Sequence, residues 1–123
     1  MKLNLLLLLV VNTVVSACIN TPRPKEDVLL RVTGNANNVD LYYRRSEDLP
    51  YIDLINMDLP WETTLTNVDT DKLLSFGVYS LDGRTKTIRC EVVVDGQLVE
   101  KMEKNDPFTF VTCTTILSEV LDK

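Results

Sequence analysis

The sequence predicts a small all-β fold, an antiparallel β-sandwich of roughly seven or eight strands. After residue 27, apolar and polar residues alternate with the period of two that a half-buried strand requires. Turn-forming residues interrupt this alternation at spacings of about 8–12 residues, which is typical of sandwiches and barrels. No segment of about ten or more residues carries the apolar stripe of a helix. A barrel of about six strands needs the same alternation and remains an alternative.

The first half of this domain contains four expected strands. They cover residues 28–33, 39–44, 51–55 and 61–66. The first ends at a turn rich in Gly and Asn, residues 34–38. In the second, Val39, Leu41 and Tyr43 share one face. The third has the weakest alternation, whereas the fourth follows Pro60 and is rich in β-forming residues.

The second half contains a long strand, a hairpin and a final strand. These segments cover residues 73–81, 87–94, 97–100 and 108–116. Leu74, Phe76 and Val78 share a face of the long strand. Asp95-Gly96 separates two alternating segments, which is the strongest short-range signal for a type I′ hairpin. The final strand follows a proline.

Composition and charge limit the function classes. The chain has 123 residues, enough for one domain, with 13 Lys and Arg against 18 Asp and Glu and a net charge of −5. This acidic balance argues against nucleic acid as a partner, because phosphate binding needs a cationic stripe. The sequence contains no His, which removes the usual general base, the Ser–His and Cys–His pairs and most zinc sites. We therefore expect a non-enzymatic module with no catalytic residue, metal or cofactor.

Residues 1–17 are typical of a signal peptide. Lys2 provides the charged start, residues 5–11 form an unbroken apolar run, and small residues precede Cys18. The apolar run is too short for a membrane-spanning helix, which needs about 20 residues. The sequence therefore predicts export.

The residues before the expected cleavage point resemble a bacterial lipobox. Val15-Ser16-Ala17-Cys18 places an aliphatic residue and two small ones before a Cys, which is the residue that receives diacylglycerol in lipoproteins. We expect lipidation at Cys18 and a Pro-containing tether after it. The expected divisions are a signal peptide at 1–17, the lipidated Cys and tether at 18–27, the sandwich domain at 28–117 and a C-terminal tail at 118–123. The alternative is an ordinary signal peptide that releases a freely secreted protein.

The two remaining cysteines are expected to form a disulfide. In an exported, oxidising setting, two thiols in a small domain usually become oxidised. Cys90 and Cys113 would then join the hairpin strand to the final strand. A metal site and a reactive thiol are the competing interpretations. Neither has support, because the sequence has no CxxC motif and no His.

A candidate ligand or partner surface consists of Tyr42, Arg44, Arg45 and Trp61. The aromatic and cationic side chains of the first three are of the types that meet a glycan or an anionic lipid headgroup. The plainer interpretation places Tyr43 in the core, leaves Tyr42 in solvent and makes the two arginines the polar end of a strand. For Trp61, a large ring at a strand start fills the edge of a sandwich core more often than it binds a ligand. The plainer interpretation is preferred in both cases.

Several short motifs follow one another along the expected domain. They are Val32-Thr33-Gly34, Val39-Asp40-Leu41-Tyr42-Tyr43, Leu59-Pro60-Trp61, Cys90 with Val93-Val94-Asp95-Gly96, and Cys113. In this order the motifs, over roughly residues 28–116, resemble the soluble domain of the MmpS (mycobacterial membrane protein small) family. The resemblance implies an immunoglobulin-like β-sandwich with a disulfide, held outside the cytoplasmic membrane and without catalytic activity. MmpS proteins act as accessory partners of RND-type transporters that export lipids and siderophores, but they typically keep an uncleaved transmembrane helix, from which the lipobox-like Cys18 departs.

These inferences together predict an exported cell-envelope lipoprotein on the periplasmic or cell-surface side of a membrane. Its expected partners are the membrane, through the N-terminal lipid, and an envelope protein such as an RND-type transporter or a surface complex. Nucleic acid is not expected as a partner. The alternative function is that of a freely secreted small β-protein, such as an inhibitor or an adhesin subunit.

Overall fold

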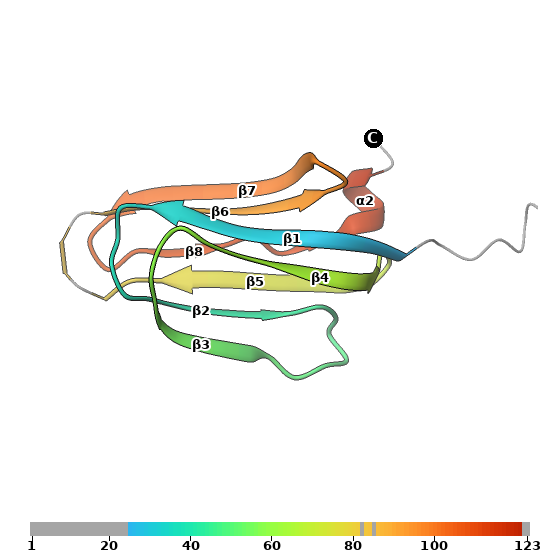
Figure 1. Cartoon of the computed structure of the whole chain (residues 1–123), viewed down its shortest axis with the longest axis horizontal. Helices are drawn as coiled ribbons and strands as arrows, with labels where there is room; N and C mark the ends of the chain where they lie inside the picture. The colour runs from blue at the N-terminus through green and yellow to red at the C-terminus, as the bar shows by residue number, and fades with distance from the viewer. Residues whose placement is uncertain (1–24, 82, 85, 122–123) are drawn as a thin grey trace, which may run out of the picture.

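The computed structural model describes residues 25–81, 83–84 and 86–121. These residues form nine β-strands and one short helix (Figure 1). The elements are β1 (Lys25–Gly34), β2 (Val39–Arg44), β3 (Ile52–Met57), β4 (Trp61–Asp69), β5 (Leu73–Tyr79), β6 (Lys86–Val94), β7 (Gln97–Asp106), β8 (Phe110–Thr112), β9 (Thr115–Ile116) and α2 (Leu117–Leu121). The predicted all-β class is therefore confirmed.

The strands form two antiparallel sheets, which confirms the sandwich rather than the barrel (Figure 1). One sheet has the order β4-β1-β6-β7, and the other has the order β3-β2-β5-β8, with β9 also pairing with β5. Among β1 to β8, the β2–β3 and β6–β7 hairpins stay within one sheet, while every other connection crosses between the sheets. The two sheets are thus built from interleaved parts of the chain.

Alternate residues of the two inner faces form one hydrophobic core. Phe76 and Val78 of β5 are fully buried, as the alternation predicts, and so are Ile88, Cys90 and Val92 of β6. All five belong to a single buried cluster that draws on both sheets. Because burying a large apolar side chain is worth about 1.5–3 kcal/mol, this cluster is the main source of stability.

The hairpin between β6 and β7 has the predicted geometry. Asp95 and Gly96 both have positive φ, at 52° and 76°, as a type I′ turn requires. The two strands pair directly on either side of this turn. β7 continues to Asp106, beyond the predicted end at Glu100, because β6 offers pairing partners along its whole length.

β1 begins earlier than the sequence predicts. It starts at Lys25, although the sequence predicts a tether through Asp27. Lys25 pairs with Asp69 of β4, and their side chains form an ion pair at 3.4 Å. Asp27 lies at a register shift, where its carboxylate accepts a 3.1 Å hydrogen bond from the backbone N–H of Asn67. These charged residues extend the strand because β4 is long enough to pair with them.

The C-terminal part departs from the single strand expected over 108–116. Phe108 has a positive φ of 52°, and the chain then forms two short strands, β8 and β9, on either side of Cys113. Both strands pair with β5. The expected tail, 118–123, contributes residues through Leu121 to helix α2, because Leu121 packs against the core.

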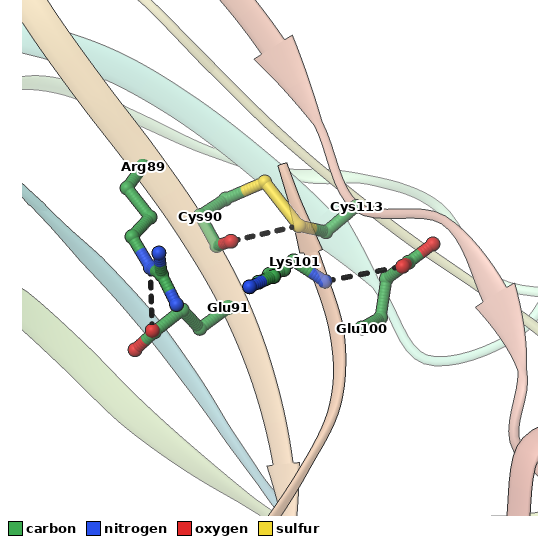
Figure 2. The surroundings of a disulfide bond; sticks show 6 residues. All are labelled: Arg89, Cys90, Glu91, Glu100, Lys101 and Cys113. Carbon is green, nitrogen blue, oxygen red and sulfur yellow. Dashed lines mark hydrogen bonds and ion pairs between the residues drawn. A yellow bond between two sulfur atoms is a disulfide. The ribbon is translucent and has the colours of Figure 1, made fainter. Parts of the chain in front are cut away.

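Cys90 and Cys113 form the predicted disulfide. Cys90 lies in β6 and Cys113 lies between β8 and β9, so the bond joins the two sheets (Figure 2). The two Cα atoms are 6.1 Å apart, within the ordinary range for disulfides. The cysteines are 23 residues apart in the sequence, and closing a loop of this size is worth about 3 kcal/mol in the chain-entropy account.

Glu91, next to the disulfide on β6, lies between two arginines. Its carboxylate accepts 2.7 Å hydrogen bonds from Nε of Arg31 on β1 and from Nε of Arg89 on β6, and Figure 2 shows the Arg89 contact. The Glu91 side chain is only 11% exposed. Burial by itself raises the pKa of this carboxyl, but the hydrogen bonds and charges of Arg31 and Arg89 outweigh burial and lower the pKa from its usual 4.5. These contacts fasten β1 to β6.

Removing the disulfide should lower the free energy of unfolding. Replacing Cys90 and Cys113 together with Ala, or reducing the wild type, should cost about 3 kcal/mol, because the unfolded chain regains the entropy of the open loop. Urea unfolding followed by tryptophan fluorescence measures the difference. Cys18→Ala is the matched control and should leave the midpoint unchanged. Equal midpoints for the oxidised and reduced wild type would contradict this prediction.

Glu91→Gln should lower the free energy of unfolding by about 1–3 kcal/mol near neutral pH, because it leaves two arginines without their shared carboxylate. The pKa of Glu91 is lower in the folded protein than in the unfolded chain, so its contribution is present above pH 4.5 and is lost as the pH falls below this value. The variant should therefore lose less stability than the wild type on acidification. Urea midpoints from about pH 7 to about pH 3 measure this difference, with Glu103→Gln, a more exposed partner of Arg89 at 3.9 Å, as the control. Parallel curves of urea midpoint against pH for the wild type, Glu91→Gln and Glu103→Gln would contradict this prediction.

Candidate functional site

Tyr42 lies across the backbone of Gly77 on the sheet formed by β3, β2, β5 and β8. The two residues pair between β2 and β5. A Cβ atom placed on Gly77 would lie 2.5 Å from both Cζ and Oη of Tyr42, which is far inside the contact distance of nonbonded atoms. A glycine within a strand weakens a sheet and often marks a close approach. Here the approaching group is the tyrosine ring.

Arg44 and Tyr51 complete an aromatic cluster with Tyr42. The rings of Tyr42 and Tyr51 meet edge to face, with centroids 5.2 Å apart. The Cζ atom of Arg44 lies 4.2 Å from the centroid of Tyr51, a cation–π distance. Burial, and to a lesser extent the nearby phenol of Tyr51, raises the pKa of Tyr42 above its usual 10.0. Asp53 and the two tyrosines line a shallow hollow of about 340 Å³.

The β2–β3 loop, residues 45–51, is held in place from both sides. Nη1 of Arg44 donates long, 3.5 Å hydrogen bonds to the backbone carbonyls of Glu47 and Leu49. The Glu47 carboxylate accepts a 2.7 Å hydrogen bond from the backbone N–H of Leu73, at the start of β5. Hydrogen bonds with its own backbone and with that of Leu73 lower the pKa of Glu47. The loop is therefore fastened to the sheet rather than free of it.

Arg45 bridges the open side of the sandwich. Its Nη1 donates a 2.8 Å hydrogen bond to the carbonyl of Thr66 on β4, so it connects the loop of one sheet to the edge strand of the other. Within the described part of the chain, neither Arg44 nor Arg45 forms an ion pair with a carboxylate. In this respect they differ from the two arginines that share Glu91.

A groove of about 430 Å³ lies between the β2–β3 loop and β4. We call it the Arg45 groove. Its lining residues are Tyr43, Arg44, Arg45, Leu49, Pro50, Ile52, Thr63, Thr64 and Leu65. Apolar side chains form much of this lining. Among these residues, Leu49 is 43% exposed and Ile52 is 48% exposed. The arginines and threonines add polar groups along its sides.

Trp61 does not line the Arg45 groove. Its ring centroid lies 6.2 Å from that of Tyr43 and 6.1 Å from that of Phe76, and its partly buried side chain packs against the core. This placement agrees with the core interpretation of Trp61. The other three candidate residues divide between two features that share Arg44. Tyr42 and Arg44 both contact Tyr51 in the aromatic cluster, whereas Arg44 and Arg45 line the Arg45 groove.

Sequence reasoning alone does not find the rest of the groove. Ile52 belongs to the weak strand expected at 51–55, and β3 has exposed residues at both alternating sets of positions, which explains the weak pattern. Thr63 and Thr64 come next to the loop only through folding. An apolar residue in a loop, Leu49, is the one signal that the sequence offers.

Three further expectations concern the lipidation site, metal binding and membrane-spanning helices. Cys18, the expected lipidation site, lies outside the described residues. Among residues 25–121, apart from 82 and 85, no group of three or more Cys, Asp and Glu side chains is arranged to hold a metal ion. In the same described ranges, no helix has the length and apolar character needed to cross a membrane.

Gly77→Ala should lower the free energy of unfolding by about 1–3 kcal/mol, because the added methyl group collides with the Tyr42 ring. In a Tyr42→Ala background the same change should cost nothing, since the colliding atoms are gone. Urea unfolding of the wild type, both single variants and the double variant forms a cycle that isolates this contact. Strictly additive effects would contradict the prediction.

The site is equipped for non-covalent binding. Its two arginines supply fixed positive charge and several hydrogen-bond donors, and its apolar side chains supply surface that a ligand can bury. An arginine side chain provides neither a nucleophile nor a general base near neutral pH.

No known protein family and no curated protein matches the chain.

Proposed function

We propose that the chain is an exported cell-envelope lipoprotein whose β-sandwich is a non-catalytic binding or assembly module. The observation that carries this proposal is the lipobox-like Val15-Ser16-Ala17-Cys18 at the end of a leader with signal-peptide character. Lipid supplies the location in this proposal, and the folded domain supplies recognition.

The disulfide supports the exported setting. Disulfides form and persist in oxidising compartments and are rare in the cytosol. The sequence has three Cys, and the Cys90–Cys113 bond uses two of them. Cys18 is therefore the remaining thiol, and it stands at the position that a lipoprotein requires.

The short distance along the chain between Cys18 and the domain suits an anchor. β1 begins at Lys25, seven residues after Cys18, and seven residues span at most about 25 Å. The β2–β3 loop lies at the same end of the domain as the start of β1 (Figure 1). Arg44 pairs with Ser75 near the start of β5, Lys25 pairs with Asp69 at the end of β4, and a tight turn joins β4 to β5. The proposed anchor thus holds the Arg45 groove near the membrane.

A transporter-accessory role is the finer form of this proposal. It is supported by the resemblance of motifs such as Leu59-Pro60-Trp61 to the MmpS family, whose members assist RND-type transporters. The lipobox-like Cys18 departs from the membrane helix of that family, so the coarser role of a lipid-anchored binding module is the better supported one. A freely secreted inhibitor or adhesin subunit is the alternative.

Cys18→Ala should abolish labelling by a fatty-acid analogue. Cells grown with an alkyne fatty acid should label the wild type, because a lipoprotein Cys carries two or three acyl chains. This number of chains is also what stable anchoring needs. The Cys18→Ala protein should be unlabelled and should leave the membrane fraction. The matched control replaces both Cys90 and Cys113 with Ala and should keep its label. A label that persists without Cys18 sinks the proposal, and an unlabelled wild type in the medium supports free secretion.

A further inference from the structure

The Arg45 groove lies along a regular stretch of strand edge. β4 is at the edge of its sheet, and an edge strand directs about half of its backbone N–H and C=O groups away from its neighbour. From Trp61 to Leu65, β4 pairs with β1 in regular register, and the register shift comes after Leu65. Thr63, Thr64 and Leu65 within this stretch line the groove. Backbone donors and acceptors of β4 therefore border it.

The other sheet edges carry features that discourage a further strand. β3 pairs regularly with β2 only from Ile52 to Leu54, before a register shift and a positive φ at Asn56. β4 has equivalent features, a register shift and a positive φ at Asn67, but they follow a longer regular stretch from Trp61 to Leu65. β7 carries Lys101 and Lys104 among alternating charges, and β8 has only three residues. Bulges, lysines and short length are the means by which natural sheet edges avoid pairing with other chains. Between Trp61 and Leu65, β4 has no lysine, proline or register shift.

Two arginines that have no carboxylate partner within residues 25–81, 83–84 and 86–121 border the same groove. Arg45 reaches β4 at Thr66, directly after the lining stretch, and Arg44 lines the groove from the loop side. The Nε atom of Arg44 is buried and has no hydrogen-bond partner in the described structure. Because the chain as a whole has a net charge of −5, two such arginines at one place are a specific feature. Their natural complement is a carboxylate, which a guanidinium can bind through two hydrogen bonds.

We propose that the Arg45 groove binds an extended peptide that carries a carboxylate. The peptide adds a strand to β4, its alternate apolar side chains pack against Leu49 and Ile52, and its carboxylate meets Arg45. In this binding mode, backbone hydrogen bonds supply affinity and side-chain pockets supply selectivity. The carboxylate belongs to an acidic side chain of the peptide. The inference names the partner class of the proposed binding module and in that sense rests on it.

An anionic membrane is a poorer occupant for this groove. Glu26, Asp27 and Asp95 line a hollow with Lys25 at the same end of the domain, and their carboxylates repel anionic headgroups. An acyl chain in the groove would also leave the edge groups of β4 without hydrogen-bond partners, whereas a peptide supplies both donors and acceptors. The geometry therefore favours the peptide.

A defined peptide tests the proposal. The probe is a fluorescein-labelled peptide of about eight residues, a length that matches a typical strand. Threonine alternates with valine along it, and glutamate replaces one valine, so that the apolar side chains and the carboxylate lie on the same face of the strand. Fluorescence anisotropy with the full chain in detergent micelles should show saturable binding. Ile52→Glu should abolish this binding, because it places a negative charge in the groove. Ile55→Glu is the matched control, since Ile55 is on the same strand, is 68% exposed and does not line the groove.

Further arms of the experiment identify the groups that bind. Arg45→Ala should lower the affinity for the peptide about tenfold, because a charge-assisted contact is lost. Lys101→Ala removes a charge from the opposite edge of the same sheet and should leave the affinity unchanged. Two further peptides are methylated, each at one of the two alternate sets of backbone nitrogens. Methylation of the set that pairs with β4 should abolish binding, whereas methylation of the other set should not. A peptide with glutamine in place of glutamate should lose binding, whereas a peptide that keeps its glutamate but has an amidated C-terminus should bind as before.

Several results would overturn the proposal. They are the absence of saturable peptide binding, unchanged affinity for both methylated peptides, equal effects of Ile52→Glu and Ile55→Glu, or unchanged affinity for the glutamine peptide. Binding to phosphatidylglycerol vesicles that requires Arg45, without peptide binding, assigns the groove to a membrane instead. The wild type and Cys18→Ala are measured side by side, so peptide binding is scored independently of lipid attachment. Failure of this inference is thereby distinguishable from failure of the lipoprotein proposal.

Discussion

The burial of alternate side chains from both sheets is the interaction on which the rest of the structure depends. Phe76 on β5 and Val92 on β6 come from different sheets and are both fully buried in one core. This packing fixes the separation of the sheets, and the disulfide then joins them covalently. The Arg45 groove exists only because that separation is fixed, since one of its sides is β4 from one sheet and the other is the β2–β3 loop from the second.

Much of the fold is predictable because it rests on local chemistry. The expected strand at 39–44 coincides with β2, and Asp95-Gly96 makes the expected turn. The differences arise where pairing partners decide the outcome. Lys25 joins β1 because Asp69 of β4 lies opposite it, and the segment around Cys113 divides into two short strands because its positions along β5 are separate. Such partners are distant in the sequence, so alternation within one segment cannot reveal them.

The candidate site is predictable only in part, for the same reason. Arg44 and Arg45 stand out in the sequence as adjacent cations. That neither has an ion-pair partner among the residues the structure describes is a property of the fold. The apolar residues opposite them come from β3 and β4, which the sequence separates from each other by a turn. Trp61 is the reverse case. It is conspicuous in the sequence as the single Trp, yet its ring packs beside Phe76.

The seven-residue interval between Cys18 and Lys25 has a consequence for how strong recognition must be. In the proposed anchored form, the domain searches for partners only within a thin layer beside the bilayer. Confinement to such a layer raises the local concentration of the domain relative to a partner on the same membrane, compared with free solution. A shallow groove with two cations and a strand edge then needs less affinity than a soluble binder would. A longer interval would let the domain explore a thicker layer and would lower this local concentration.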